Sequence, residues 1–140
     1  MKLIKGELLP ENMYYQLKYD GVGISGEVFV SATAYDLSGS KVFELADNIQ
    51  KPEWDESGDY TGLVAGLIAC TKRGFKNILI VGSSQLEQHS EIAEFFMDLF
   101  TNFTNVASIC IETRELNTDA FNLTAEVIQS KKPFYRQFPK

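Results

Sequence analysis

The stretch from Glu56 to Cys70, ESGDYTGLVAGLIAC, places an acidic side chain at the start of a helical pattern. The Asp59 carboxylate could cap the first turn of that helix, or it could be one member of a metal-binding carboxylate set. Gly62 and Gly66 share the same helical face, at offsets of three and seven residues. Because a glycine costs about 1 kcal/mol in helix propensity, we predict that both glycines let the helix lie close against a sheet.

The last ten residues, KKPFYRQFPK, form a second candidate site. Cations alternate with aromatic rings there, and the residues concerned are Lys131, Lys132, Phe134, Tyr135, Arg136 and Phe138. Such a mixture can neutralise phosphates and stack on bases, or it can dock on an acidic partner. The structural alternative is a tail that folds back across the domain.

The overall charge limits the choice of partner. The 140-residue chain carries a formal net charge of -6, which opposes the broad contact with phosphates on which nucleic-acid affinity depends. A protein partner or a homodimer is therefore favoured over nucleic acid. No window approaches a membrane span and the N-terminus lacks a signal-peptide pattern, so we expect a cytoplasmic protein without a membrane partner.

The two cysteines carry no sign of metal or redox chemistry. Cys70 and Cys110 lie in apolar runs and lack C-x-x-C spacing. We predict that both are reduced residues of the core.

The hydrophobic pattern predicts one α/β domain with the element order βββαβαβα. Three alternating segments before Pro52 are typical of an antiparallel meander, and a helical apolar face follows them. Continuous apolar runs at 77–82 and 106–113 are typical of buried strands, and helical patterns occupy 85–103 and 119–129. This order indicates a mixed five-stranded sheet with helices on its faces.

Four short motifs have an order and spacing that resemble the ribonuclease H-like superfamily, in its ribonuclease HI-type form. They are YDG at 19–21, DYTGLVAGL at 59–67, GSSQLE at 82–87 and RELNTDAFNLTAE at 114–126. The resemblance implies a ribonuclease H-like domain at 14–130. An N-terminal leader at 1–13, which could add a short edge strand, precedes it, and the basic, aromatic tail at 131–140 follows it.

The resemblance also implies where a nuclease centre would lie. Members that cleave RNA in RNA–DNA hybrids hold two magnesium ions about 4 Å apart with four carboxylates. The first two positions match Asp20 and Asp59, but the third and fourth fall on Ser83 and Phe121. A serine hydroxyl binds magnesium weakly and a phenyl ring cannot bind it. Asp20 and Asp59 are then remnants, serving a turn and a helix cap, or a weak single-cation site.

We therefore expect a catalytically impaired ribonuclease H-like domain that acts as a binding or scaffolding module and has no cofactor. One alternative is a divergent ribonuclease H that uses Mg²⁺ or Mn²⁺ to cleave RNA in RNA–DNA hybrids. A second alternative is a nucleic-acid binder without catalysis, which would bind through the tail at 131–140.

Overall fold

The computed structural model describes residues 1–50, 60–83, 96–111 and 113–138. Its strands are β1 (Lys2–Lys5), β2 (Tyr15–Ile24), β3 (Glu27–Tyr35), β4 (Lys41–Gln50), β5 (Asn77–Gly82), β6 (Asn105–Cys110) and β7 (Phe134–Gln137). Its helices are α1 (Thr61–Lys72) and α3 (Thr118–Ser130), with short 3-10 turns η1 (Glu11–Met13) and η3 (Arg114–Leu116). Residues 96–100 are also helical.

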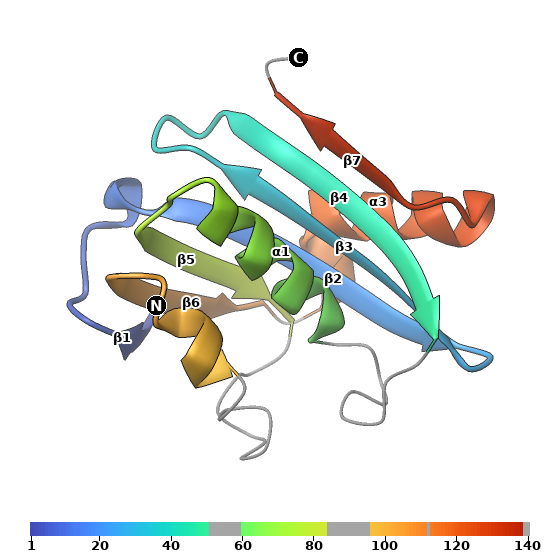
Figure 1. Cartoon of the computed structure of the whole chain (residues 1–140), viewed down its shortest axis with the longest axis horizontal. Coiled ribbons are helices and arrows are strands. Elements are labelled where there is room, and N and C mark those ends of the chain that lie inside the picture. Colours follow the sequence, from blue (N-terminus) through green and yellow to red (C-terminus); the bar gives the residue numbers. More distant parts are fainter. Residues whose placement is uncertain (51–59, 84–95, 112, 139–140) are drawn as a thin grey trace.

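The strands form a single mixed sheet in the order β1-β6-β5-β2-β3-β4-β7 (Figure 1). Strands β2, β3 and β4 make the predicted antiparallel meander, while β5 runs parallel to β2 and β6 runs parallel to β5. Three successive residues of β5, Ile78, Leu79 and Ile80, are buried on alternate faces, which explains its continuous apolar sequence. This arrangement confirms the predicted fold class.

The sheet has seven strands rather than the five expected, because both terminal segments pair with its edges. β1 pairs with β6, and β7 pairs with β4, both in the antiparallel sense. Apolar side chains explain the docking, since Ile4 packs against the main core and Phe134 packs against a smaller cluster that contains Val127. The N-terminal segment thus contributes an edge strand, and the tail folds back across the domain.

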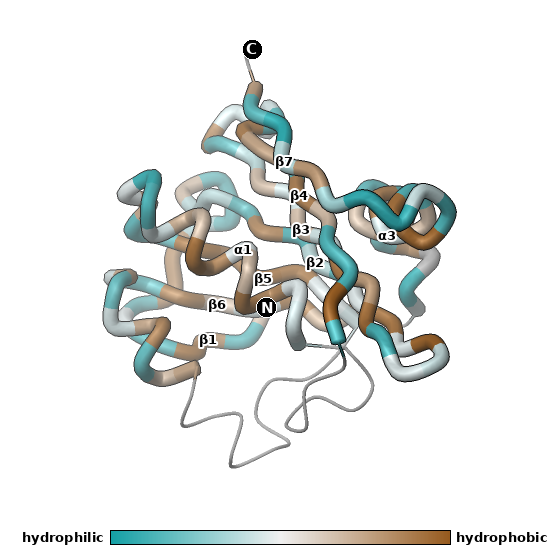
Figure 2. The backbone as a smooth tube through the Cα atoms, turned by 45° about the vertical axis from the view of Figure 1, so that its right-hand side comes forward, coloured by the Kyte–Doolittle hydropathy of each residue, from teal (hydrophilic) through white to brown (hydrophobic). Residues whose placement is uncertain are grey.

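Helices α1 and α3 cover opposite faces of the sheet (Figures 1 and 2). On the α1 face, Leu63, Leu67 and Cys70 of the helix are buried against Leu17 and Phe43 of the strands. The hydrophobic strand segments, drawn in brown in Figure 2, lie between the two helices. The main core therefore sits between α1 and the sheet.

Gly62 and Gly66 bring α1 close to the sheet, as predicted. A Cβ atom at Gly62 would lie 2.6 Å from the carbonyl oxygen of Asp20 and 2.8 Å from that of Ser31. A Cβ atom at Gly66 would lie 2.8 Å from Leu17 Cδ1. A side chain at either position would push the helix away from β2 and β3, so glycine is required by the packing.

Polar contacts dock α3 on the opposite face. The Ser31 hydroxyl donates a hydrogen bond to the Ala120 carbonyl oxygen (2.6 Å) and lies 2.8 Å from Thr124 Oγ1. Asp119 occupies the first turn of α3 and accepts a hydrogen bond from the Tyr35 hydroxyl. Negative charge is favoured at that end of a helix.

The two cysteines differ in their exposure to solvent. Cys70 is buried, but Cys110 is exposed, so the prediction for Cys110 is wrong. The reason is that β6 ends at Cys110 rather than at residue 113, so Cys110 is the last residue of the strand and does not lie inside it.

Residues 96–100 are helical and lie within the helix expected at 85–103, whereas residues 84–95 lie outside the described ranges. No helix within the described ranges is long and apolar enough to span a bilayer.

Candidate active site

Asp20 lies near the middle of the sheet, and its carboxylate is held by an arginine. It is 4% exposed and pairs across the ladder with Ser31 of β3. Arg114, the first residue of η3, donates from Nε to Oδ1 and from Nη2 to Oδ2, each at 2.7 Å. This bidentate geometry matches the planar guanidinium to both carboxylate oxygens. A positive charge supplied by the chain itself therefore neutralises Asp20.

Phe121 packs against the same guanidinium group. The Arg114 Cζ atom lies 5.0 Å from the centroid of the Phe121 ring, which is a cation–π distance. Phe121 is in the second turn of α3, where its N–H donates to the Asn117 carbonyl oxygen at 2.9 Å. Phe121, which occupies the position that the resemblance assigned to a fourth carboxylate, thus stabilises the Arg114 cation through the face of its ring. Its side chain has no oxygen that could bind a metal ion.

Ser83 directly follows β5, the neighbour of β2. The register pairs Lys18 with Val81, and two further residues along both strands bring Ser83 level with Asp20. Ser83 is half-buried, and its carbonyl oxygen lies 3.6 Å from Cys110 Sγ. The topology therefore brings this predicted site residue toward Asp20, without a second negative charge.

Asp59 lies outside the described residues, so the choice between a cap and a ligand stays a prediction. Helix α1, which begins at Thr61, lies close to Asp20, because Gly62 packs against the Asp20 carbonyl oxygen. Sequence reasoning missed two residues near this point. Arg114 holds Asp20, and Asn117 donates from Nδ2 to the Tyr19 carbonyl oxygen at 2.8 Å. Both belong to the RELN segment at 114–117, whose resemblance to the family gave no sign of these contacts.

The described side chains do not fit a two-metal clamp. Within the described ranges, no three His, Cys, Asp or Glu residues are grouped so that they could hold a metal ion. Both oxygens of Asp20 accept hydrogen bonds from Arg114, and the other described positions carry a hydroxyl and a phenyl ring. Two divalent cations need several negatively charged oxygens, which this set does not supply.

The tail residues named as a candidate site are engaged with the domain. Arg136 donates to Glu44 Oε1 (2.9 Å) and to Glu126 Oε2 (2.5 Å), and these hydrogen bonds, the one to Glu126 first, raise the pKa of Arg136. The Tyr135 ring stacks on Phe43 with centroids 5.7 Å apart.

The other members of the tail make weaker contacts. Lys131 Nζ lies 5.9 Å from the centroid of the Phe29 ring, and Lys41 Nζ lies 5.7 Å from that of Phe138. Lys132 is exposed. The tail thus presents fewer available cations than its sequence indicates, because Arg136 is already paired with two carboxylates.

Comparison with solved structures identifies the architecture. Ribonuclease H1 from the halophilic archaeon Halobacterium salinarum NRC-1 superposes with a TM-score of 0.70 at 21% identity, over 84% of this chain and 98% of that one. LC11-RNase H1 in complex with an RNA/DNA hybrid gives a TM-score of 0.69 at 16% identity, over 84% and 98%. The N-terminal ribonuclease H domain of a Mycobacterium tuberculosis protein gives 0.65 at 18%, over 79% and 95%.

These superpositions show that the chain has the ribonuclease H-like fold. At these identities the likeness concerns the fold, and the chemistry must be argued from the side chains. No family model matches the sequence, and no curated protein matches it significantly.

Proposed function

We propose that this chain is a catalytically impaired ribonuclease H-like domain that acts as a binding or scaffolding module through protein contacts. The observation that carries the proposal is the Asp20 carboxylate, bound at both oxygens by Arg114 while Phe121 packs on the guanidinium. An arginine cannot polarise water or clamp two phosphate oxygens as a pair of divalent ions does. Its charge instead stabilises the fold at the point where the metal would be needed.

The proposal is tested with a fluorescently labelled RNA–DNA hybrid in the presence of Mg²⁺ or Mn²⁺. The parent chain should show no cleavage above the protein-free background, and Asp20→Asn should behave in the same way. Asp98→Asn is the matched control, because Asp98 is an exposed carboxylate on a different element. Turnover by the parent that Asp20→Asn abolishes and Asp98→Asn retains would establish the divergent, metal-dependent ribonuclease H instead.

A second candidate, hybrid binding without cleavage, is favoured by one observation. LC11-RNase H1, which has the same fold, was solved in complex with an RNA/DNA hybrid. The net charge of -6 and the pairing of Arg136 with two carboxylates weigh against this candidate here. The anisotropy of the labelled hybrid in the same experiment measures binding, and salt-sensitive binding without turnover would favour this second candidate.

A further inference from the structure

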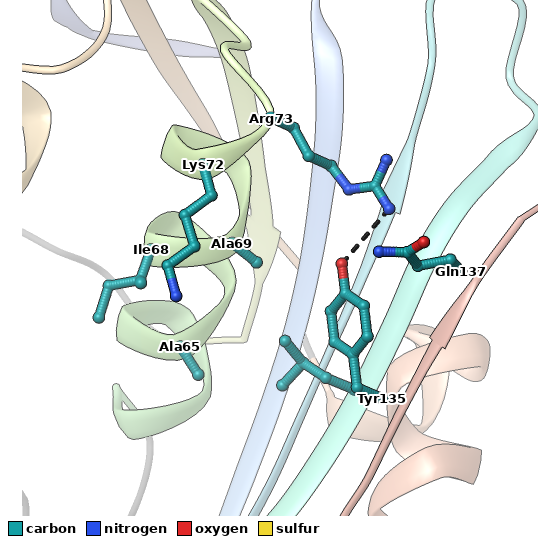
Figure 3. A pocket seen from close by; sticks show the side chains of 8 residues that line it. Ala65, Ile68, Ala69, Lys72, Arg73, Tyr135 and Gln137 are labelled. Carbon is teal, nitrogen blue, oxygen red and sulfur yellow. Dashed lines mark hydrogen bonds between the residues drawn. The ribbon is translucent and has the colours of Figure 1, made fainter.

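A groove of about 640 Å³ lies between α1 and the edge of the sheet formed by β4 and β7 (Figure 3). We refer to it as the α1–β7 groove. Its apolar surface comes from Ala65, Ile68 and Ala69 on the helix and from Leu45 and Tyr135 on the strands. Ile68 is 42% exposed and Tyr135 is 48% exposed, so both present apolar surface to an incoming group.

The open edge of β7 adjoins this groove. β7 is the last strand in the sheet order. The Phe138 N–H donates to the Val42 carbonyl oxygen at 2.8 Å, and hydrogen bonds to an antiparallel neighbour alternate along a strand. The main-chain groups of Tyr135 and Gln137 therefore point away from β4. Their side chains line the groove, so an added strand would meet hydrogen-bonding groups and a pocket together.

The charged residues of the groove are both cations. Lys72 and Arg73 line it, and none of the lining residues in the described ranges is acidic. Figure 3 shows Lys72 along the helix and Arg73 reaching toward Tyr135, with a 3.3 Å hydrogen bond from Arg73 Nη2 to the Tyr135 hydroxyl. Neither cation forms an ion pair with a carboxylate in the described part of the chain, and the buried Arg73 Nε has no hydrogen-bond partner. This charge favours an acidic occupant.

A second copy of this chain is a poor match for the edge. Two β7 edges paired side by side would add the Lys72 and Arg73 of a second groove to the interface, with no acidic groove residue among the described ones to balance them, and like charges at an interface are costly. Nucleic acid would meet the two cations, but its many further phosphates would meet the field of a chain with a net charge of -6, whereas a short peptide segment brings only the few carboxylates that Lys72 and Arg73 can pair with. An acidic peptide satisfies the cations and can use the backbone edge.

We propose that the α1–β7 groove and the outer edge of β7 bind an extended, acidic segment of a partner protein. This inference rests on the proposed function and names the surface that performs it. The segment adds an eighth strand beside β7, with hydrogen bonds to the main chain of Tyr135 and Gln137. Alternate side chains then enter the groove, where a carboxylate meets Lys72 and Arg73 and an apolar side chain covers Ile68.

The probe for the test is a labelled peptide, TETVTET, which places glutamate and valine on one face of a strand and threonine on the other. The matched peptide TKTVTKT reverses the charge. We expect the acidic peptide to bind the full chain in a salt-sensitive way and to slow amide exchange at Tyr135 and Gln137. The lysine peptide should not bind.

Two pairs of variants locate the site. Lys72→Glu should weaken binding by about tenfold, whereas Lys76→Glu should leave it unchanged, because Lys76 is exposed outside the groove and its ammonium group lies near the Asn102 carbonyl oxygen. Gln137→Pro should weaken binding far more than Gln137→Ala, since both variants remove the side chain that lines the groove and only proline also removes the outward N–H, without breaking a bond to β4.

Three outcomes would overturn the inference. They are equal binding of both peptides, binding that ignores Lys72→Glu and Gln137→Pro, and preferential binding of a labelled RNA–DNA hybrid or of a second copy of the chain at this edge. The hybrid-cleavage assay is independent, because Lys72 ends α1 whereas Asp20 lies beside the first turn of that helix, and because β3 and β4 separate the strand of Gln137 from the strand of Asp20. Cleavage of the hybrid would contradict the proposed function, and the peptide-binding result could still be interpreted separately.

Discussion

The ion pair with Arg114 gives the buried Asp20 carboxylate a role in the stability of the fold. The Asp20 side chain is 2% exposed and the Arg114 side chain is 31% exposed, so one partner of the ion pair is desolvated and the other reaches solvent. Removing only the arginine leaves a buried negative charge without its partner. This costs more free energy than the intact ion pair contributes to stability.

We predict that Arg114→Ala lowers the free energy of unfolding by about 3 kcal/mol, measured by urea denaturation. The double variant Arg114→Ala with Asp20→Asn should recover part of that loss, because the uncompensated charge is gone. Lys132→Ala, an exposed cation, is the control and should change stability by less than about 0.5 kcal/mol. An Arg114→Ala effect as small as that of the control would show that the ion pair does not hold the site.

The two thiols should react very differently. Burial raises the pKa of the Cys70 thiol from 9.0 to about 12, whereas Cys110 is exposed. At about pH 8, a disulfide reagent should modify Cys110 in the native protein and Cys70 only after unfolding. Rapid modification of both thiols in the native protein would contradict this. Because the folded-state pKa is the higher one, the contribution of neutral Cys70 to stability is complete below pH 9.0 and is lost as the pH rises toward about 12.

At the scale of the elements, the contact between α1 and the sheet depends on the absence of side chains. Gly62 faces main-chain oxygens of Asp20 and Ser31, which cannot move aside, while the nearest neighbour of Gly66 is the end of the Leu17 side chain. We predict that Gly62→Ala destabilises the protein by about 1–3 kcal/mol despite the better helix propensity of alanine. Gly66→Ala should cost less. Thermal unfolding measures both, and a gain in stability for Gly62→Ala would refute the close approach.

Hydrophobic periodicity predicted the elements whose burial leaves a pattern in their own residues. The alternation before Pro52 indicated the meander, and the apolar run at 77–82 indicated β5, because burial on one or both faces leaves a direct pattern. β7 has only four residues, and its strand state depends on the open edge of β4, which no local pattern reveals. The end of β6 was placed too late, since the register with β5 ends at the pair Gly82 and Cys110 although the apolar run continues to Ile111.

At the scale of the whole molecule, the motifs indicated where Asp20, Ser83 and Phe121 lie in the fold and did not indicate their contacts. Asp20 lies within β2, Ser83 directly follows β5, and Phe121 lies near the start of α3. The pairing of Asp20 with Arg114 joins residues 94 positions apart, and it depends on how η3 approaches the sheet. Tertiary packing decides such contacts. The same holds for the α1–β7 groove, whose walls come from both halves of the chain.

The pairing of the two terminal strands has a consequence for how the protein is made. Lys2 lies opposite Ser108, and Phe43 lies opposite Gln137. On the ribosome, the meander can assemble from adjacent segments as they emerge, whereas β1 must wait for β6 and the outer side of β4 waits for β7. Until β7 has emerged, the nascent domain therefore has an uncovered edge at β4, and the sheet is completed only when residues 134–137 have left the exit tunnel.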